Sequence, residues 1–213
     1  QYFGDGSGGP TGEFSKLRRC GSAVGALNNN GFPGQVIFSA LPGTQQTVPR
    51  AEHYAFILLL EAVEPFSTIR YYTDHLNLAK DFPKGKTHNL NSMNVDLYLQ
   101  EYKLIENKHL QVEVVWVKAH LHEHDDLPEG VTVQMVRGNK MADEYALKGA
   151  NLHQLPAHLT KDIEDKYHLV RNIQNRLIDI LMSLEKREKA PPIPKVHGPR
   201  PPNGARIVIL YFT

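Results

Sequence analysis

The stretch that decides the fold is QYFGDGSGGPTG, residues 1–12 of a chain of 213 residues. Its first four residues predict a strand, and the glycines and the proline that follow permit a tight turn. Asp5 lies where the strand meets this turn. Because the first residue is Gln1 and the strand begins at once, we expect the chain to be a processed or excised piece of a longer protein.

Beyond this strand, the sequence predicts further strands followed by alternating helices and strands. Two strand-like segments, 22–28 and 35–41, flank the turn-forming Asn29-Asn30-Gly31 and predict an antiparallel meander. The later predicted elements are a helix at 50–63, a strand at 68–73, helices near 76–82 and 95–107, a strand at 110–117 and a helix through 140–149. This order predicts an α/β fold with a mixed five-stranded sheet, an antiparallel meander plus parallel strands, flanked by helices.

The strand at 110–117 is the most apolar of the predicted strands. We therefore expect it to be buried, with Trp116 in the core. The stretch between the two preceding helices, which contains Lys84 and Lys86, predicts a polar loop.

The composition changes after about residue 151. We predict a first domain at 1–151, a helical extension at 152–189, and a proline-rich basic linker with a terminal strand-like segment at 190–213. Apolar residues in the extension repeat at alternating three- and four-residue spacing, like the seam of a coiled coil: Val170, Ile173, Leu177, Ile180 and Leu184. This seam predicts packing either on the domain or on a protein partner, which would bind through the helix at 160–189 and the C-terminal segment.

The composition is that of an ordinary globular protein, with 41% hydrophobic and 22% charged residues. The 24 basic and 23 acidic residues give no overall basic excess that would indicate nucleic-acid binding. A single cysteine, Cys20, excludes an internal disulfide framework and a cysteine-built zinc site. No apolar run approaches the roughly 20 residues that span a bilayer, and no signal peptide is visible. We expect an intracellular protein with no membrane partner.

Four carboxylates occupy special places in this plan. Asp5 lies at the first glycine turn, Glu52 in the first turns of a helix, Asp74 at the end of a strand, and Asp143 near the start of the 140–149 helix. A single such acid is usually solvated, but four that converge would repel one another unless divalent cations bind them. Oxygen ligands without cysteine favour Mg²⁺ or Mn²⁺ over zinc.

Five short motifs surround these acids and a histidine, in this order: Phe3-Gly4-Asp5-Gly6-Ser7, Arg50-Ala51-Glu52, Tyr72-Thr73-Asp74, Trp116-Val117-Lys118-Ala119-His120 and Gly138-Asn139-Lys140-Met141-Ala142-Asp143. Over about residues 1–150, the chain resembles type 1 ribonuclease H, and in particular the ribonuclease H domains of retroelements. The spacing of 22 residues between Glu52 and Asp74 also fits that family.

The resemblance implies a nuclease that hydrolyses the RNA strand of an RNA–DNA hybrid endonucleolytically with two Mg²⁺ or Mn²⁺ ions. It makes Asp5, Glu52, Asp74 and Asp143 the metal ligands, with Asp5 shared between the ions. His120 matches the family's mobile catalytic histidine, which assists proton transfer or product release. The residues implied in nucleic-acid binding are Gly6, Ser7, Gly8, Arg50, Lys84, Lys86 and Asn139.

The chain departs from the family in two places that matter for substrate recognition. Val48 and Pro49 replace an asparagine pair that senses the RNA strand, and His75 and Leu76 replace a serine and a glutamine. We therefore expect recognition of the 2′-hydroxyl to depend more on backbone groups of the turn at 6–12.

Two other functions remain open at this stage. The first alternative is a non-catalytic, ribonuclease H-like scaffold subunit of a larger assembly, in which only the fold is retained. The second is another nuclease of the same broad fold, such as a transposase, an integrase or a junction resolvase, although those families lack the combined motifs. The preferred interpretation is a ribonuclease H domain of a retroelement polyprotein.

Overall fold

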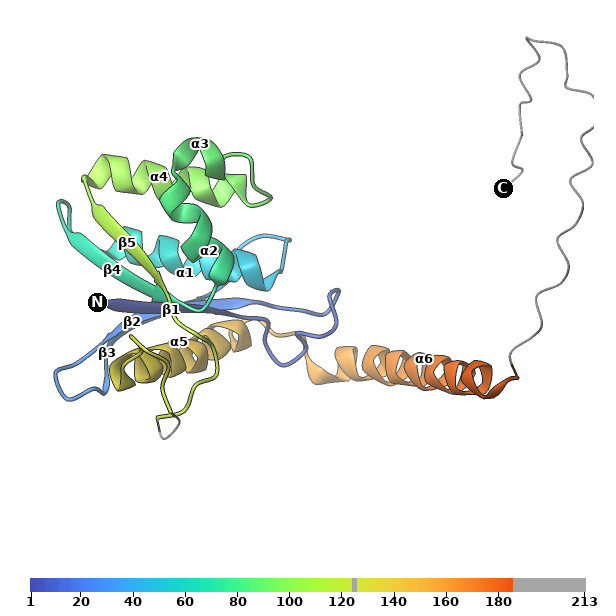
Figure 1. The fold of residues 1–213 in the computed structure, drawn as a ribbon. Helices are drawn as coiled ribbons and strands as arrows, with labels where there is room; N and C mark the ends of the chain where they lie inside the picture. The colour runs from blue at the N-terminus through green and yellow to red at the C-terminus, as the bar shows by residue number, and fades with distance from the viewer. Residues whose placement is uncertain (124–125, 186–213) are drawn as a thin grey trace, which may run out of the picture. The chain divides into compact units, whose positions relative to one another are not determined.

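The computed structural model describes residues 1–123 and 126–185, so the predicted linker and terminal strand at 190–213 lie outside the described residues. Its elements, labelled in Figure 1, are β1 (Tyr2–Ser7), β2 (Gly21–Leu27), β3 (Pro33–Ala40), α1 (Val48–Ala62), β4 (Thr68–Thr73), α2 (Leu76–Asp81), a 3-10 turn (Phe82–Lys84), α3 (Lys86–Asn89), α4 (Val95–Lys108), β5 (Gln111–Trp116), α5 (Val133–Asn151) and α6 (Ala157–Ser183).

The five strands form one mixed sheet in the order β3-β2-β1-β4-β5. β1 pairs antiparallel with β2, and β2 with β3, which is the predicted meander. β1 also pairs parallel with β4, and β4 with β5. The predicted α/β fold class is therefore confirmed.

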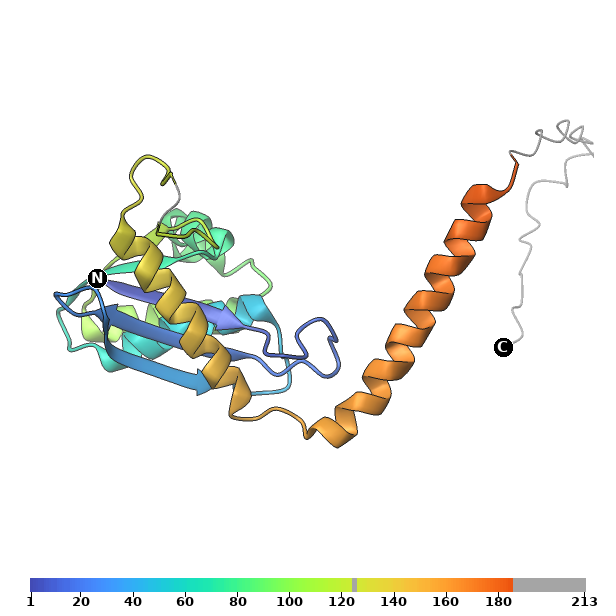
Figure 2. The same ribbon diagram turned by 90° about the horizontal axis from the view of Figure 1, so that it is seen from below.

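Helices cover both faces of this sheet (Figures 1 and 2). α1 lies on one face, with α4 packed against it, and α5 crosses β1, β2 and β3 on the other. α1 begins after Thr47 with Pro49 in its first turn, where a missing N–H costs nothing. Its buried side chains include Ala55, Phe56 and Leu59, whose helical spacing lets one stripe face the sheet.

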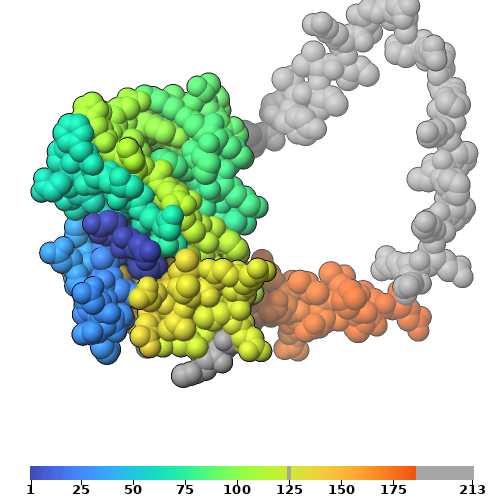
Figure 3. Space-filling view, turned by 60° about the vertical axis from the view of Figure 1, so that its left-hand side comes forward, coloured from blue at the N-terminus to red at the C-terminus, as the bar shows by residue number. Residues whose placement is uncertain are grey.

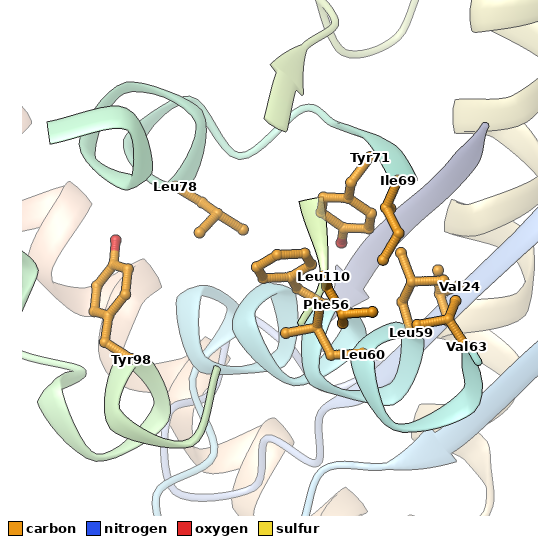
Figure 4. Packing of buried hydrophobic residues seen from close by; sticks show 10 residues of the cluster. All are labelled: Val24, Phe56, Leu59, Leu60, Val63, Ile69, Tyr71, Leu78, Tyr98 and Leu110. Atoms are coloured by element: carbon orange, nitrogen blue, oxygen red, sulfur yellow. The ribbon is translucent and has the colours of Figure 1, made fainter. Parts of the chain in front are cut away.

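The main core lies between α1 and the sheet (Figure 4). The rings of Phe56 and Tyr71 are 4.8 Å apart, and Ile69 from the same strand as Tyr71 packs beside them. Tyr72 points to the opposite face, where its ring stacks on Phe3 at 5.0 Å. The end of β4, from Tyr71 to Thr73, is therefore buried on both faces, as is typical of a central parallel strand.

The structure corrects the expectations for the last strand and the polar loop. β5 is an edge strand with half-buried and exposed residues, and Trp116 is 45% exposed rather than in the core. An apolar run does not reveal whether a strand has one neighbour or two. The loop expected near Lys84 and Lys86 contains the short helix α3.

The first compact unit runs from Gln1 to Tyr167, and the second begins at His168. In the second unit, the described part of α6 carries the predicted apolar seam, whose members Val170, Ile173 and Leu177 are exposed. Binding of a protein partner through this seam stays a prediction.

Among residues 1–123 and 126–185, no helix has the length and apolarity needed to cross a membrane.

A buried polar pair joins α1 to α4. His53 Nδ1 lies 2.7 Å from Glu101 Oε1, and both side chains are almost inaccessible. Burial raises the pKa of Glu101 well above its usual value and lowers the pKa of His53 to about 4. The two groups therefore share one proton as a neutral pair, which avoids leaving a charge in the interior.

We predict that Glu101→Ala lowers the free energy of unfolding by about 3–5 kcal/mol, because it leaves a cavity and an unpartnered buried imidazole. Glu101→Gln keeps a donor for His53 and should cost less than about 1.5 kcal/mol. Urea denaturation of the two variants checks this. Equal losses would show that the hydrogen bond contributes nothing.

Candidate metal centre

Three of the predicted metal ligands meet at the end of the sheet where β1 and β4 terminate. One carboxylate oxygen from each of Asp5, Glu52 and Asp74 lies within 4.8 Å of the others. Asp5 is on β1 and Asp74 directly follows β4, and because these strands are parallel, their carboxyl ends reach the same edge. Glu52 lies in α1, one helical turn before the core residue Phe56.

Glycine allows the strand and helices to approach closely enough for this arrangement. A Cβ on Gly6 would lie 2.5 Å from the backbone nitrogen of Glu52, a distance that no real side chain tolerates. On the other face, a Cβ on Gly138 would lie 2.3 Å from the ring of Phe3. These contacts bring α1 and α5 against β1, next to Asp5.

Asp5 and Glu52 are buried, with exposed fractions of 6% and 4%. Burial raises the pKa of Asp5 to about 7, and the charges of Asp74 and Asp143 act in the same direction. A hydrogen bond with Glu52 and the Gly6 N–H, which donates to Asp5 Oδ1 at 2.7 Å, act in the opposite direction. The pKa of Glu52 is raised well above its usual value, first by burial and then by the charge of Asp5. Without a cation, these carboxyls resist ionisation.

The fourth predicted ligand, Asp143, lines the same pocket as Asp5 and Asp74. α5 supplies Asp143 and Asn139 to the pocket lining, and the segment after β5 supplies His120. Figure 3 shows this segment (yellow) beside the N-terminal residues (dark blue). Asn139 Nδ2 donates to Asp74 Oδ2 at 3.3 Å, so this residue orients a carboxylate of the cluster.

Further contacts hold the end of β4 in place. The exposed indole of Trp116 donates its N–H to the carbonyl oxygen of Asp74 at 3.1 Å. Thr73 Oγ1 accepts a hydrogen bond from the backbone N–H of His75 at 3.1 Å. Asp74 is thus supported from β5 and from the turn that follows it.

Two lysines that the sequence did not single out also line the pocket: Lys118 and Lys140. Lys118 follows β5 and precedes His120 by two residues. Lys140 precedes Asp143 by three residues in α5, a spacing that places these two side chains on one side of the helix. The sequence could have identified both lysines, because each lies inside a motif that contains a predicted site residue. Their ammonium groups bring positive charge to an acidic pocket.

Three of the basic residues that were predicted to bind nucleic acid form ion pairs with carboxylates. Arg50 Nη1 donates to Asp96 Oδ1 at 2.9 Å, Lys84 Nζ to Asp81 at 2.7 Å, and Lys86 Nζ to Glu106 at 2.6 Å. Gly6, Ser7 and Gly8 lie at the end of β1 and just beyond it, with Ser7 Oγ accepting from the Gly9 N–H at 3.2 Å. Nucleic-acid binding by these residues stays a prediction.

Sequence comparisons identify no relative: no protein-family model and no curated protein matches the chain. Comparison with solved structures does find similar folds. A foamy viral protease–reverse transcriptase in complex with an RNA/DNA hybrid matches 71% of this chain at 13% identity with a TM-score of 0.51. This chain spans 20% of the length of that protein.

Two smaller proteins match as well. RNase H1 from the halophilic archaeon Halobacterium salinarum NRC-1 covers 71% of this chain and 97% of its own, at 15% identity and a TM-score of 0.47. LC11-RNase H1 in complex with an RNA/DNA hybrid covers 70% and 95%, at 11% identity and a TM-score of 0.48. The match to the foamy viral protein, together with the strand order and the flanking helices, shows that the chain has a ribonuclease H-like fold.

Proposed function

We propose that the chain is a metal-dependent endonuclease that hydrolyses the RNA strand of RNA–DNA hybrids. The observation that carries this proposal is the cluster of Asp5, Glu52 and Asp74, whose oxygens lie within 4.8 Å of one another at the edge of a ribonuclease H-like sheet. The RNA/DNA hybrid bound in the foamy viral structure supports the choice of substrate.

The residues present fit Mg²⁺ or Mn²⁺. All the donors are carboxylate oxygens, and two of the carboxyls are buried with raised pKa values, an arrangement that a divalent cation relieves. Asp5, Glu52 and Asp74 would hold the metal, with Asp143 completing a second position in the proposed two-ion site. When bound, such ions supply charge neutralisation at phosphate and activation of water.

The side chains around the cluster would position the substrate. Asn139 holds Asp74 in orientation through its amide. Lys118 and Lys140 would attract the phosphate backbone into the pocket, offsetting repulsion by the carboxylates. His120, which is exposed at the pocket with a φ of 56°, would move a proton or assist product release.

We further propose that the domain functions within a retroelement-type polyprotein. The matched region is one fifth of the foamy viral protein, which supports a role as part of a longer chain. A non-catalytic scaffold is the second candidate, and an activity assay separates the two.

We predict that the protein cuts the RNA strand of a hybrid in Mg²⁺ and that Asp5→Asn lowers kcat by more than about a hundredfold, as expected when a preorganised charged group is lost. Asp179→Asn, an exposed surface change on α6, is the matched control and should leave kcat unchanged. Gel assays on labelled hybrid, duplex RNA and duplex DNA measure this. Undiminished activity of Asp5→Asn would refute the metal centre, and an inert wild-type protein would favour the scaffold.

We also predict an unusual pH dependence of stability in EDTA. Because the pKa of Asp5 is about 7 in the folded protein, against an ordinary value of 3.8 for an aspartate, the folded state holds the extra proton between these values. The free energy of unfolding therefore loses up to about 1.4 kcal/mol per pH unit as the pH rises through this window. Asp5→Asn lacks this titration.

Thermal unfolding of wild-type protein and Asp5→Asn from pH 5 to pH 8 tests this dependence. The Tm of the wild-type protein should fall relative to that of Asp5→Asn as the pH rises, and Mg²⁺ should restore the wild-type protein more than the variant. A difference in Tm that is independent of pH would contradict the raised pKa.

A further inference from the structure

The loop between β1 and β2, which we call the glycine loop (residues 8–19), has an ordered structure of its own. The backbone N–H of Gly12 donates to Gly9 O at 3.1 Å, and the N–H of Leu17 donates to Phe14 O at 2.8 Å. The side chains of Phe14 and Leu17 are buried, with exposed fractions of 8% and 4%. This compact loop directly follows the strand that carries Asp5.

Gln154, which follows α5, ties the glycine loop down. Its Nε2 donates to Arg19 O at 3.0 Å and to Ala150 O at 2.9 Å. Its Oε1 lies 3.5 Å from Thr11 Oγ1, whose hydroxyl donates to Leu17 O at 3.1 Å within the loop. The fit is tight, because a Cβ on Gly9 would lie 2.4 Å from Gln154 Nε2. One side chain thus connects the loop at both its start and its end to α5.

The start of α6 supplies a second contact. The ring of Tyr167 meets the ring of Phe14 edge to face, with centroids 5.1 Å apart. Thr160, in the first turn of the same helix, is buried. Figures 1 and 2 both show the glycine loop beside the segment that joins α5 to α6. Residues 152–167 therefore belong to the same compact unit as the candidate metal centre, beyond the predicted boundary at residue 151.

The glycine loop carries three cationic side chains: Lys16, Arg18 and Arg19. Within residues 1–123 and 126–185, no ion pair joins any of them to a carboxylate. Arg18 Nε donates to Gly12 O at 2.6 Å, which fixes its position in the loop. Arg50, Lys84 and Lys86, by contrast, are already paired.

We propose that residues 152–167 form a brace that holds the glycine loop, and that the loop so held binds the phosphate backbone of the RNA–DNA hybrid. This inference rests on the proposed function and names a part of its substrate-binding surface. The contacts of Gln154 and Tyr167 position the loop, while its cations supply the attraction to phosphate. Gln154 and Tyr167 are positioning residues, since neither would touch the substrate.

The brace should affect binding rather than chemistry. Asp5, Glu52 and Asp74 are held by β1, α1 and the end of β4, none of which depends on Tyr167. A loop released from the brace would have to be ordered again when the hybrid binds, and that entropy cost weakens affinity. The KM for the hybrid should therefore rise while kcat is retained.

The test uses the full chain with Gln154→Ala and Tyr167→Ala, and with Tyr167→Phe as the matched control that keeps the ring. Limited trypsin digestion without nucleic acid, followed by mass spectrometry, reports cleavage after Lys16, Arg18 and Arg19. We expect cleavage there to be roughly tenfold faster in both alanine variants, because local opening exposes the loop. In Mg²⁺, their KM should rise about tenfold with kcat within a factor of two of the wild-type value. Tyr167→Phe should match the wild-type protein in both assays.

Unchanged cleavage of the loop in both alanine variants would overturn the brace. Faster cleavage with an unchanged KM, or a loss confined to kcat, would overturn its role in substrate binding. If the wild-type protein cuts no hybrid, the proposed function fails, and fluorescence anisotropy of the same labelled hybrid decides the inference. Weaker binding by the alanine variants then supports it, and equal binding refutes it.

Discussion

The burial of Asp5 against Glu52 is the constraint on which the rest of the site depends. Two carboxyls in a water-poor contact between β1 and α1 cannot both ionise unless positive charge compensates them. Gly6 permits this contact, since any side chain there would collide with the backbone of Glu52. The fold therefore holds an arrangement that is unfavourable for the protein alone and favourable with a divalent cation, which is a reason to regard it as functional rather than incidental.

The sheet topology extends this constraint to the other predicted ligands. Parallel pairing of β1 with β4 brings Asp74 to the edge where Asp5 lies, and α5 crosses the opposite face to bring Asn139 and Asp143 to the same pocket. The close approach of Gly138 to Phe3 fixes the distance of α5 from β1. Hydrogen bonds from Asn139 and Trp116 then orient Asp74, so the site depends on both layers of helices.

Much of the fold follows from local sequence patterns, and the failures have a common cause. The strand at 68–73 has the predicted bounds, because β-rich residues end there at a polar turn. Periodicity could not show that β5 lies at the edge, since the number of neighbouring strands is decided by the whole sheet. The pairing of Arg50 with Asp96 across 46 residues is equally invisible to local patterns. The acids of the cluster were predictable because their motifs, not their spacing alone, carried the information.

The near-neutral charge of the chain gives the positions of its cations particular importance. With 24 basic and 23 acidic residues, long-range attraction to a polyanion is weak, so contacts must come from cations that are not already neutralised by carboxylates. Lys118 and Lys140 line the pocket, and the glycine loop carries three more cations, so under the proposed function these two groups would supply the contacts to the backbone of a nucleic-acid strand. Such a strand would be bound by local geometry rather than by overall charge. A loop that is already ordered would keep more of this attraction as affinity, because its cations would lose less conformational entropy when they meet the phosphates.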